Sequence, residues 1–277
     1  MRAMAADPVQ RAALWIYKHA DRSGLLETAP VRQLFTFVYG QYKRRIEDPF
    51  HHLARSHPEL FAGGHVLDVG ANIGYTAGVF ATVVETGFSV WAFEPASDNV
   101  RKLQAMVDDR GLQSAVKIVR AAVSDCRGTI DLVLNPDNPA DHRLPAPSGP
   151  APPDRATERV PLTTVDDEVR ERSVRPVSFI KIDVQGCELS VCRGMVRTLA
   201  DNPSAAVAVE FAPALMRTFG DDPEALPRFF ADRAYVPFRL KLRGELVPMQ
   251  GADFSAPMPP RGYIDVLFRR ERSEGGR

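Results

Sequence analysis

The stretch HVLDVGANIGYTAGVFA at residues 65–81 decides the fold of this protein. Its first residues are apolar around Asp68, as in a buried strand, and its last residues repeat apolar groups at helical spacing. Gly70 and Gly74 lie between the two patterns, where glycine lets a backbone turn tightly and approach a ligand closely. A strand, a glycine turn and a helix in this order predict a nucleotide-binding unit of an open α/β sheet.

Strand-like and helix-like segments alternate downstream of this unit. Strands are expected at 88–94, 177–184 and 204–211, as short and mostly apolar runs separated by helical patterns. This alternation predicts a mainly parallel sheet with helices on both faces. Two further strand-like segments, 235–242 and 263–270, have no convincing helix between them and indicate an antiparallel edge.

The chain divides into two predicted parts. Residues 1–60 have helical spacing and are expected to form an extension or lid, and residues 61–277 form the α/β domain. Eight of the 27 residues in the segment 135–161 are proline, which excludes a regular helix or a central strand there. A loop of this length is often functional, and we predict that 135–161 borders the active site.

Composition narrows the classes of function. The chain has 35 basic and 35 acidic residues, so the global positive field typical of nucleic-acid binding is missing, and no nucleic-acid partner is expected. No apolar run suggests a signal peptide or a membrane span. Three cysteines, at 126, 187 and 192, form no disulfide-like array. These features predict a cytoplasmic protein.

The charge at the glycine turn discriminates between nucleotides. The spacing G-x-x-x-G differs from the G-x-G-x-x-G of dinucleotide enzymes. Asp68 would add a negative charge beside a pyrophosphate, whereas the cationic S-adenosylmethionine (SAM) would be attracted to it. Glu94, at the end of the next strand, is placed to accept hydrogen bonds from ribose hydroxyls. The turn therefore favours SAM over a nicotinamide dinucleotide.

Five motifs make the chain resemble the FkbM-type family of SAM-dependent methyltransferases over about residues 65–211. They are VLDVGANIGYTA, AFEP, AAVSD followed by a glycine, LTTVDD and, most specifically, FIKIDVQGCELSVCRGM. The family usually has glutamate where this chain has Gln185, which keeps the shape but loses the charge. The resemblance implies a seven-stranded, Rossmann-like class I methyltransferase sheet, and O-methylation in natural product or polysaccharide biosynthesis.

The resemblance also implies a set of cofactor-binding residues. The glycine turn would hold the methionine part, Asp68 its amino group or a bridging water, Glu94 the ribose, and the turn at 122–124 the adenine. The complete predicted set is Asp68, Gly70, Ala71, Asn72, Gly74, Glu94, Pro95, Ala122, Val123, Ser124 and Asp183.

Methyl transfer to an alcohol needs a group that removes the hydroxyl proton, or a metal that acidifies it. Asp183 and Glu210 end neighbouring predicted strands and are candidate catalytic residues, together with His142 in the proline-rich segment. Asp183, Glu210 and Asp141 are candidate oxygen ligands of a divalent cation such as Mg²⁺. Lys181, inside the same apolar strand as Asp183, is interpreted as a structural residue that pairs with an acid.

We therefore expect an O-methyltransferase acting on a hydroxyl of a sugar, glycoside or secondary metabolite. N-methylation of an amine or nucleic acid is the first alternative, but the Asn/Asp-Pro-Pro-aromatic run of many such enzymes is replaced here by residues 183–186, DVQG. A SAM-binding protein without turnover is the second alternative, because of Gln185. A homodimer is a further expectation, since 1–60 offers aromatic surface.

Overall fold

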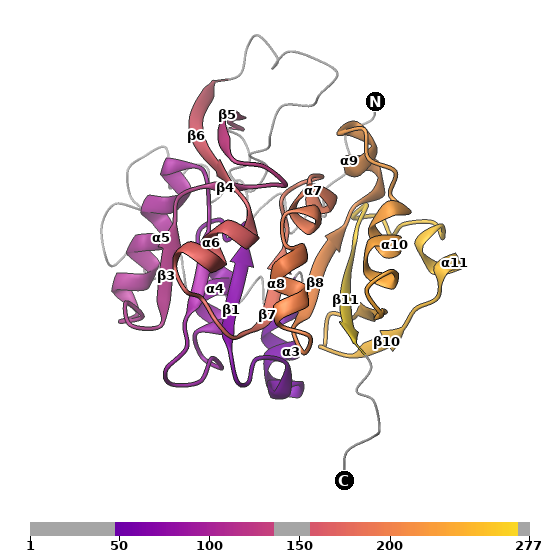
Figure 1. The fold of residues 1–277 in the computed structure, drawn as a ribbon, viewed down its shortest axis with the longest axis horizontal. Coiled ribbons are helices and arrows are strands. Elements are labelled where there is room, and N and C mark those ends of the chain that lie inside the picture. The colour runs from indigo at the N-terminus through magenta and orange to yellow at the C-terminus, as the bar shows by residue number, and fades with distance from the viewer. Residues whose placement is uncertain (1–47, 136–155, 271–277) are drawn as a thin grey trace.

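The computed structural model describes residues 48–135 and 156–270. Its main sheet contains eight strands in the order β10-β9-β11-β8-β7-β1-β2-β3 (Figure 1). Five adjacent strands run parallel, which confirms the predicted mainly parallel sheet. They are β3 (Val116–Val119), β2 (Val90–Phe93), β1 (His65–Val69), β7 (Val177–Ile182) and β8 (Ala206–Phe211).

The strand count corrects the expectation of seven. The additional strand, β10 (Leu246–Pro248), forms an antiparallel hairpin with β9 (Tyr235–Leu240) and is the outermost strand on that side. The antiparallel strands β9, β10 and β11 (Ile264–Arg270) form one side of the sheet, as predicted, and β11 lies between β8 and β9. The fully buried Val266, Leu267 and Phe268 of β11 explain this position, because three consecutive apolar residues need cover on both faces.

A second, three-stranded sheet lies above the main sheet in Figure 1. It consists of β4 (Ala122–Val123), β6 (Thr157–Thr163) and β5 (Gly128–Val133), in that order. The apolar run 115–123, which reads as a single strand in the sequence, is therefore split between two sheets. Only its first part pairs with β2.

Helices cover both faces of the main sheet, as predicted. One face packs against α3 (Phe50–Ser56), α4 (Tyr75–Phe80) and α5 (Ser97–Asp109). The other face packs against five helices: α6 (Val165–Glu171), α7 (Glu188–Arg193), α8 (Val196–Asp201), α9 (Pro213–Thr218) and α10 (Ala225–Ala231). Of these, α6, α8 and α10 lie in front in Figure 1. The short α11 (Gly251–Phe254) precedes β11. The apolar spacing of residues 187–200 is typical of one continuous helix, but the structure has two helices there, α7 and α8, with Gly194 between them.

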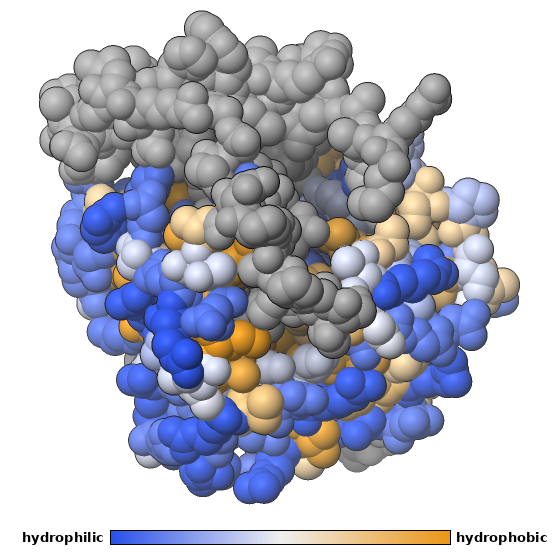
Figure 2. Space-filling model, turned by 90° about the horizontal axis from the view of Figure 1, so that it is seen from above, coloured by the Kyte–Doolittle hydropathy of each residue, from blue (hydrophilic) through white to orange (hydrophobic). Residues whose placement is uncertain are grey.

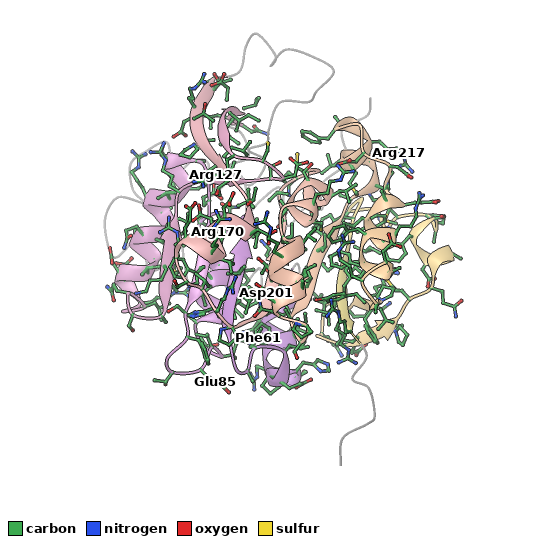
Figure 3. The ribbon with its side chains drawn as sticks, viewed as in Figure 1. Phe61, Glu85, Arg127, Arg170, Asp201 and Arg217 are labelled. Atoms are coloured by element: carbon green, nitrogen blue, oxygen red, sulfur yellow. The ribbon has the colours of Figure 1, made fainter. Side chains whose placement is uncertain are left out.

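Of the predicted N-terminal extension, residues 48–60 belong to the described part of the chain and 1–47 lie outside it. The described part enters the main core, where Phe50 and Leu53 are buried. Phe61, which follows this extension, lies at the lower end of the sheet in Figure 3. Its ring packs at a tilt against that of Phe179, with ring centroids 4.5 Å apart. Helix α3 is therefore an integral part of the α/β core.

Apolar side chains are concentrated inside the molecule. Figure 2 shows hydrophilic residues over most of the visible described surface, with apolar residues in small groups between them. Among the residues that the structure describes, no helix is long and apolar enough to cross a membrane.

Candidate active site

Four acidic residues that were predicted to belong to the site lie at the carboxyl ends of parallel strands, on one edge of the sheet. Asp68 lies in β1, Glu94 follows β2, Asp183 follows β7, and Glu210 lies near the end of β8. Asp68 stands beside Lys181 in the register of β1 and β7. Because side chains alternate along a strand, Asp183 shares the face of Lys181. The acids that are distant in sequence therefore converge at one place.

The glycine turn has the strained backbone that its sequence predicts. Gly70 and Gly74 have φ values of 81° and 90°, and Asn72 between them also has a positive φ of 52°. A Cβ atom at Gly70 would lie 1.9 Å from the backbone oxygen of Asp183. Glycine is thus required at position 70 because the loops that follow two adjacent strands touch there. This requirement holds whether or not the turn also binds a ligand.

Glu94 is a buried carboxyl group, 5 % exposed, directly below this turn. Its Oε2 accepts a hydrogen bond from the backbone N–H of Asn72 at 2.9 Å, and its Oε1 accepts from the N–H of Ala96 at 3.0 Å and from Asn99 Nδ2 at 3.2 Å. Burial raises the pKa of Glu94 to about 7, although these hydrogen bonds act in the opposite direction. Glu94 therefore ties the turn to the start of α5.

Asp68 and Lys181 form the most deeply buried charged pair of the site. Asp68 is 0 % exposed, and its Oδ2 accepts a hydrogen bond of 2.6 Å from Thr76 Oγ1 in α4. Lys181 Nζ lies 3.4 Å from Asp68 Oδ1 and 3.5 Å from Asp183 Oδ2. Burial lowers the pKa of Lys181, but the surrounding carboxylates, Asp183 first, outweigh it and raise the pKa above its ordinary value. Lys181 thus stays charged.

Asp183 differs from Asp68 because its side chain is 33 % exposed. Gln185 donates from Nε2 to Asp183 Oδ1 at 2.8 Å and to Glu210 Oε1 at 3.4 Å. The amide nitrogen therefore lies between two of the three predicted metal ligands. The described residues contain no group of three or more acidic, histidine or cysteine side chains that could hold a metal, and Asp141 lies outside them. Two of the three predicted ligands are thus bridged by an amide N–H group, and the metal site stays a prediction.

Two carboxyl groups beside Glu210 were not expected from the sequence. Asp265 lies directly opposite Glu210 in the β8–β11 ladder, is 6 % exposed and accepts a 3.0 Å hydrogen bond from Arg261 Nη2. Burial raises the pKa of Asp265 to about 6. Burial and the neighbouring Asp183 and Asp265 raise the pKa of Glu210 well above its ordinary value. In the sequence, the only indication that Asp265 could belong to the site is that it is a single acidic residue within an apolar strand pattern.

Glu188 is the second unexpected acid, since its place in the first turn of α7 suggested no more than a helix-dipole interaction. Its side chain is 0 % exposed, and Oε1 accepts hydrogen bonds from the backbone N–H groups of Val184 at 3.1 Å and Gly186 at 3.0 Å. Burial raises the pKa of Glu188 to about 7. Glu188 therefore holds the loop that carries Asp183 and Gln185.

The remaining predicted residues lie in different environments. Ala122 and Val123 form β4, and the Ser124 N–H donates to the backbone oxygen of Thr163 at 2.9 Å. Pro95 follows Glu94 and is partly buried. His142, the candidate base, lies outside the described residues. No contact of this structure tests the cofactor and catalytic roles of these residues, which stay predictions.

Asp166 and Asp167, an acidic pair in the motif LTTVDD, have structural partners. Asp166 accepts hydrogen bonds from the backbone N–H groups of Arg197 and Thr198 at the start of α8. Asp167 pairs with Arg170 at 2.5 Å, and Arg127 and Arg170 lie close together near α6 in Figure 3. These two acids stabilise helix starts, where negative charge is favourable.

Three solved structures are among those to which the chain shows similarity. An O-methyltransferase from Bacillus cereus in complex with SAH has a TM-score of 0.47 and 11 % identity, covering 96 % of this chain and 92 % of that one. The O-methyltransferase TomG from Streptomyces achromogenes in complex with SAM has a TM-score of 0.47 and 12 % identity, with 96 % and 91 % covered. An SAH-bound methyltransferase from Podospora anserina has a TM-score of 0.45 and 11 % identity, with 94 % and 88 % covered.

The match to a family model establishes the family of this chain. The model of the methyltransferase FkbM domain matches residues 68–237, from Asp68 in β1 into β9. No curated protein matches the chain. The chain belongs to the FkbM methyltransferase family, as its motifs predicted, and is therefore a SAM-dependent methyltransferase.

Proposed function

We propose that this protein transfers a methyl group from SAM to a hydroxyl oxygen of a sugar, glycoside or other small metabolite. The observation that carries the proposal is the position of Asp183. It is a partly exposed carboxylate at the carboxyl edge of the sheet, and the backbone oxygen of Asp183 lies against Gly70 of the glycine turn. Such a group is suited to accept a proton beside the cofactor.

The chain would contribute positioning and one proton acceptor. Asp183 takes the proton of the acceptor hydroxyl while the new C–O bond forms and the C–S bond of SAM breaks, leaving SAH and a methyl ether. Holding the acceptor in line with the methyl group can supply roughly 7–11 kcal/mol of the rate enhancement. The turn at 70–74 and the carboxyl group of Glu94 would hold the cofactor.

A divalent cation is not part of this proposal. The Gln185 amide donates toward both Asp183 and Glu210, and a positively charged ion would have to displace it. The balance of 35 basic and 35 acidic residues supports a small-molecule acceptor over nucleic acid.

The substitution Asp183→Asn tests the catalytic assignment. It removes the proton acceptor but keeps the size of the side chain, so we expect methyl transfer to fall by at least about a hundredfold, as for loss of a general base. The affinity for SAH, which lacks the sulfonium charge, should stay within a few-fold. Transfer of isotope from labelled SAM into a panel of sugars and hydroxylated metabolites measures the first quantity, and calorimetry the second.

Asp201→Asn is the matched control. Asp201 is an exposed aspartate that pairs with Arg175 at 2.9 Å, and Figure 3 shows it well below the upper edge of the sheet. This variant should methylate as the unaltered protein does. Normal transfer by Asp183→Asn would show that Asp183 is not the base, and labelled product containing a methylated amine would replace the O-methyltransferase proposal.

A further inference from the structure

Lys181 connects the glycine turn after β1 to the loop that carries Asp183. The side chain is 4 % exposed, and its ammonium group lies near three acceptors: Gly70 O at 2.9 Å, Asp68 Oδ1 at 3.4 Å and Asp183 Oδ2 at 3.5 Å. The contact with Gly70 O is a hydrogen bond, whereas the two carboxylate oxygens lie at ion-pair distance. The acceptors belong to β1, to the turn after it and to the loop after β7.

The surroundings of Asp68 leave it no exposed surface. Its Oδ2 is bound by Thr76 Oγ1, and within the described residues the cation nearest its Oδ1 is Lys181. Asp183, in contrast, is one-third exposed and follows the same strand as Lys181. Its backbone N–H donates to Val69 O at 3.0 Å, so the two loops are also joined through the main chain.

We propose that Asp68 and Lys181 form a buried counter-ion pair, that Lys181 is a positioning residue for Asp183, and that Asp68 acts on the cofactor only through this pair. The inference rests on the proposed function for the role of Asp183. Two carboxylates and one ammonium group leave one net negative charge, carried by the exposed Asp183. This charge complements the sulfonium group of SAM.

The affinities for SAM and for SAH, which lacks the sulfonium charge, test the pair. In Asp68→Asn, Lys181 neutralises Asp183 instead, so the preference for SAM over SAH should fall roughly tenfold, as expected for loss of one nearby charge. In the double variant Asp68→Asn, Lys181→Met, the net charge of the site is restored. The preference should then return to within about threefold of its original value.

The competing arrangement predicts a different pattern. If Asp68 bound the amino group of the methionine part directly, Asp68→Asn would weaken SAM and SAH equally, because both carry that group. Removing Lys181 as well would restore nothing. Equal losses without recovery in the double variant would overturn the inference.

Unfolding without ligand gives a second readout that does not depend on the proposed function. Lys181→Met leaves the buried Asp68 without its counter-ion, so this single variant should lower the midpoint of thermal unfolding more than the double variant does. Losses that simply add in the double variant would contradict the pair.

A second ion pair, between the buried Glu168 and the exposed Arg172, provides the control. Glu168 is 8 % exposed and accepts a 2.6 Å hydrogen bond from Arg172 Nε, and α6, which carries Glu168, packs on the opposite face of the sheet. Glu168→Gln with Arg172→Met should change stability but leave the preference for SAM over SAH unaltered. A shift of that preference comparable to the one in Asp68→Asn would count against the inference.

Discussion

At the scale of single residues, Glu94 illustrates how one buried side chain can serve both the fold and a ligand. It binds the backbone of the glycine turn through Asn72 and the start of α5 through Ala96 and Asn99. Each carboxylate oxygen has two lone pairs, so Oε2, with one hydrogen bond, retains capacity for a ribose hydroxyl. The predicted ribose contact is compatible with these contacts.

If Glu94 holds the ribose as predicted, its raised pKa should make cofactor binding pH dependent. Burial raises this pKa from 4.5 to about 7, so without ligand the carboxyl group is largely protonated below pH 7. Ribose hydroxyls donate to the ionised form, and binding must therefore release the proton. We expect the affinity for SAH to rise with pH, by up to about tenfold per unit below pH 7, and to level off above it.

Calorimetry in buffers of different ionisation enthalpy measures the released proton directly. Glu94→Gln keeps the shape but cannot ionise, so it should bind SAH more weakly and lose most of this pH dependence. A pH dependence that persists unchanged in Glu94→Gln would assign the titration to another group, such as Glu188, whose pKa burial also raises to about 7.

At the scale of elements, the site is built where two loops touch. The turn after β1 and the loop after β7 meet at Gly70, where a Cβ atom would lie 1.9 Å from Asp183 O. Glu188 binds the second loop from within through the N–H groups of Val184 and Gly186. The position of Asp183 relative to the glycine turn is therefore set mainly by backbone contacts.

Gly70→Ala should disrupt this contact. The positive φ of 81° costs about 1–2 kcal/mol with a side chain, and the clash should add about 1–3 kcal/mol. Gly220→Ala is the control, since Gly220 has a φ of 84° but nothing within 4 Å of its Cβ position. Denaturant unfolding should show a larger loss for Gly70→Ala, and SAM affinity should fall only there. Equal losses would mean that the two loops adjust freely.

At the scale of the whole molecule, β11 joins the antiparallel hairpin of β9 and β10 to the five parallel strands. It pairs with β8 on one side and β9 on the other, and it places Asp265 opposite Glu210. The family match ends at residue 237, before β11, so this contribution to the site comes from outside the matched region. Phe268 anchors the strand by stacking on Phe230 at 3.9 Å between ring centroids.

Phe268→Ala should therefore destabilise the entire fold. The side chain is fully buried, and truncation of such a phenylalanine costs about 3–5 kcal/mol. Val247→Ala in the edge strand β10 is the control, because Val247 is 42 % exposed and should cost less than about 0.5 kcal/mol. Equilibrium unfolding followed by circular dichroism measures both. A loss below about 1 kcal/mol for Phe268→Ala would show that β11 is dispensable for the core.

Much of this architecture was determined by the sequence itself. The strand, turn and helix at 65–81 follow from local hydrophobic spacing and from the glycines. The parallel sheet follows from the alternation of elements. Asp68, Glu94, Asp183 and Glu210 gather at one edge because parallel strands end on the same side of a sheet. These features depend on neighbours in the chain and on chain direction, which a linear sequence contains.

Other features were decided only by the tertiary structure. The insertion of β11 beside β8 brought Asp265 to Glu210, and the added β10 raised the strand count to eight. The pairing of Asp68 with Lys181 depends on the register of two strands that are more than a hundred residues apart. Strand order, register and burial arise from packing between distant segments. Local patterns therefore indicated which acidic residues lie at strand ends, whereas tertiary packing decided which of these residues remain exposed at the site.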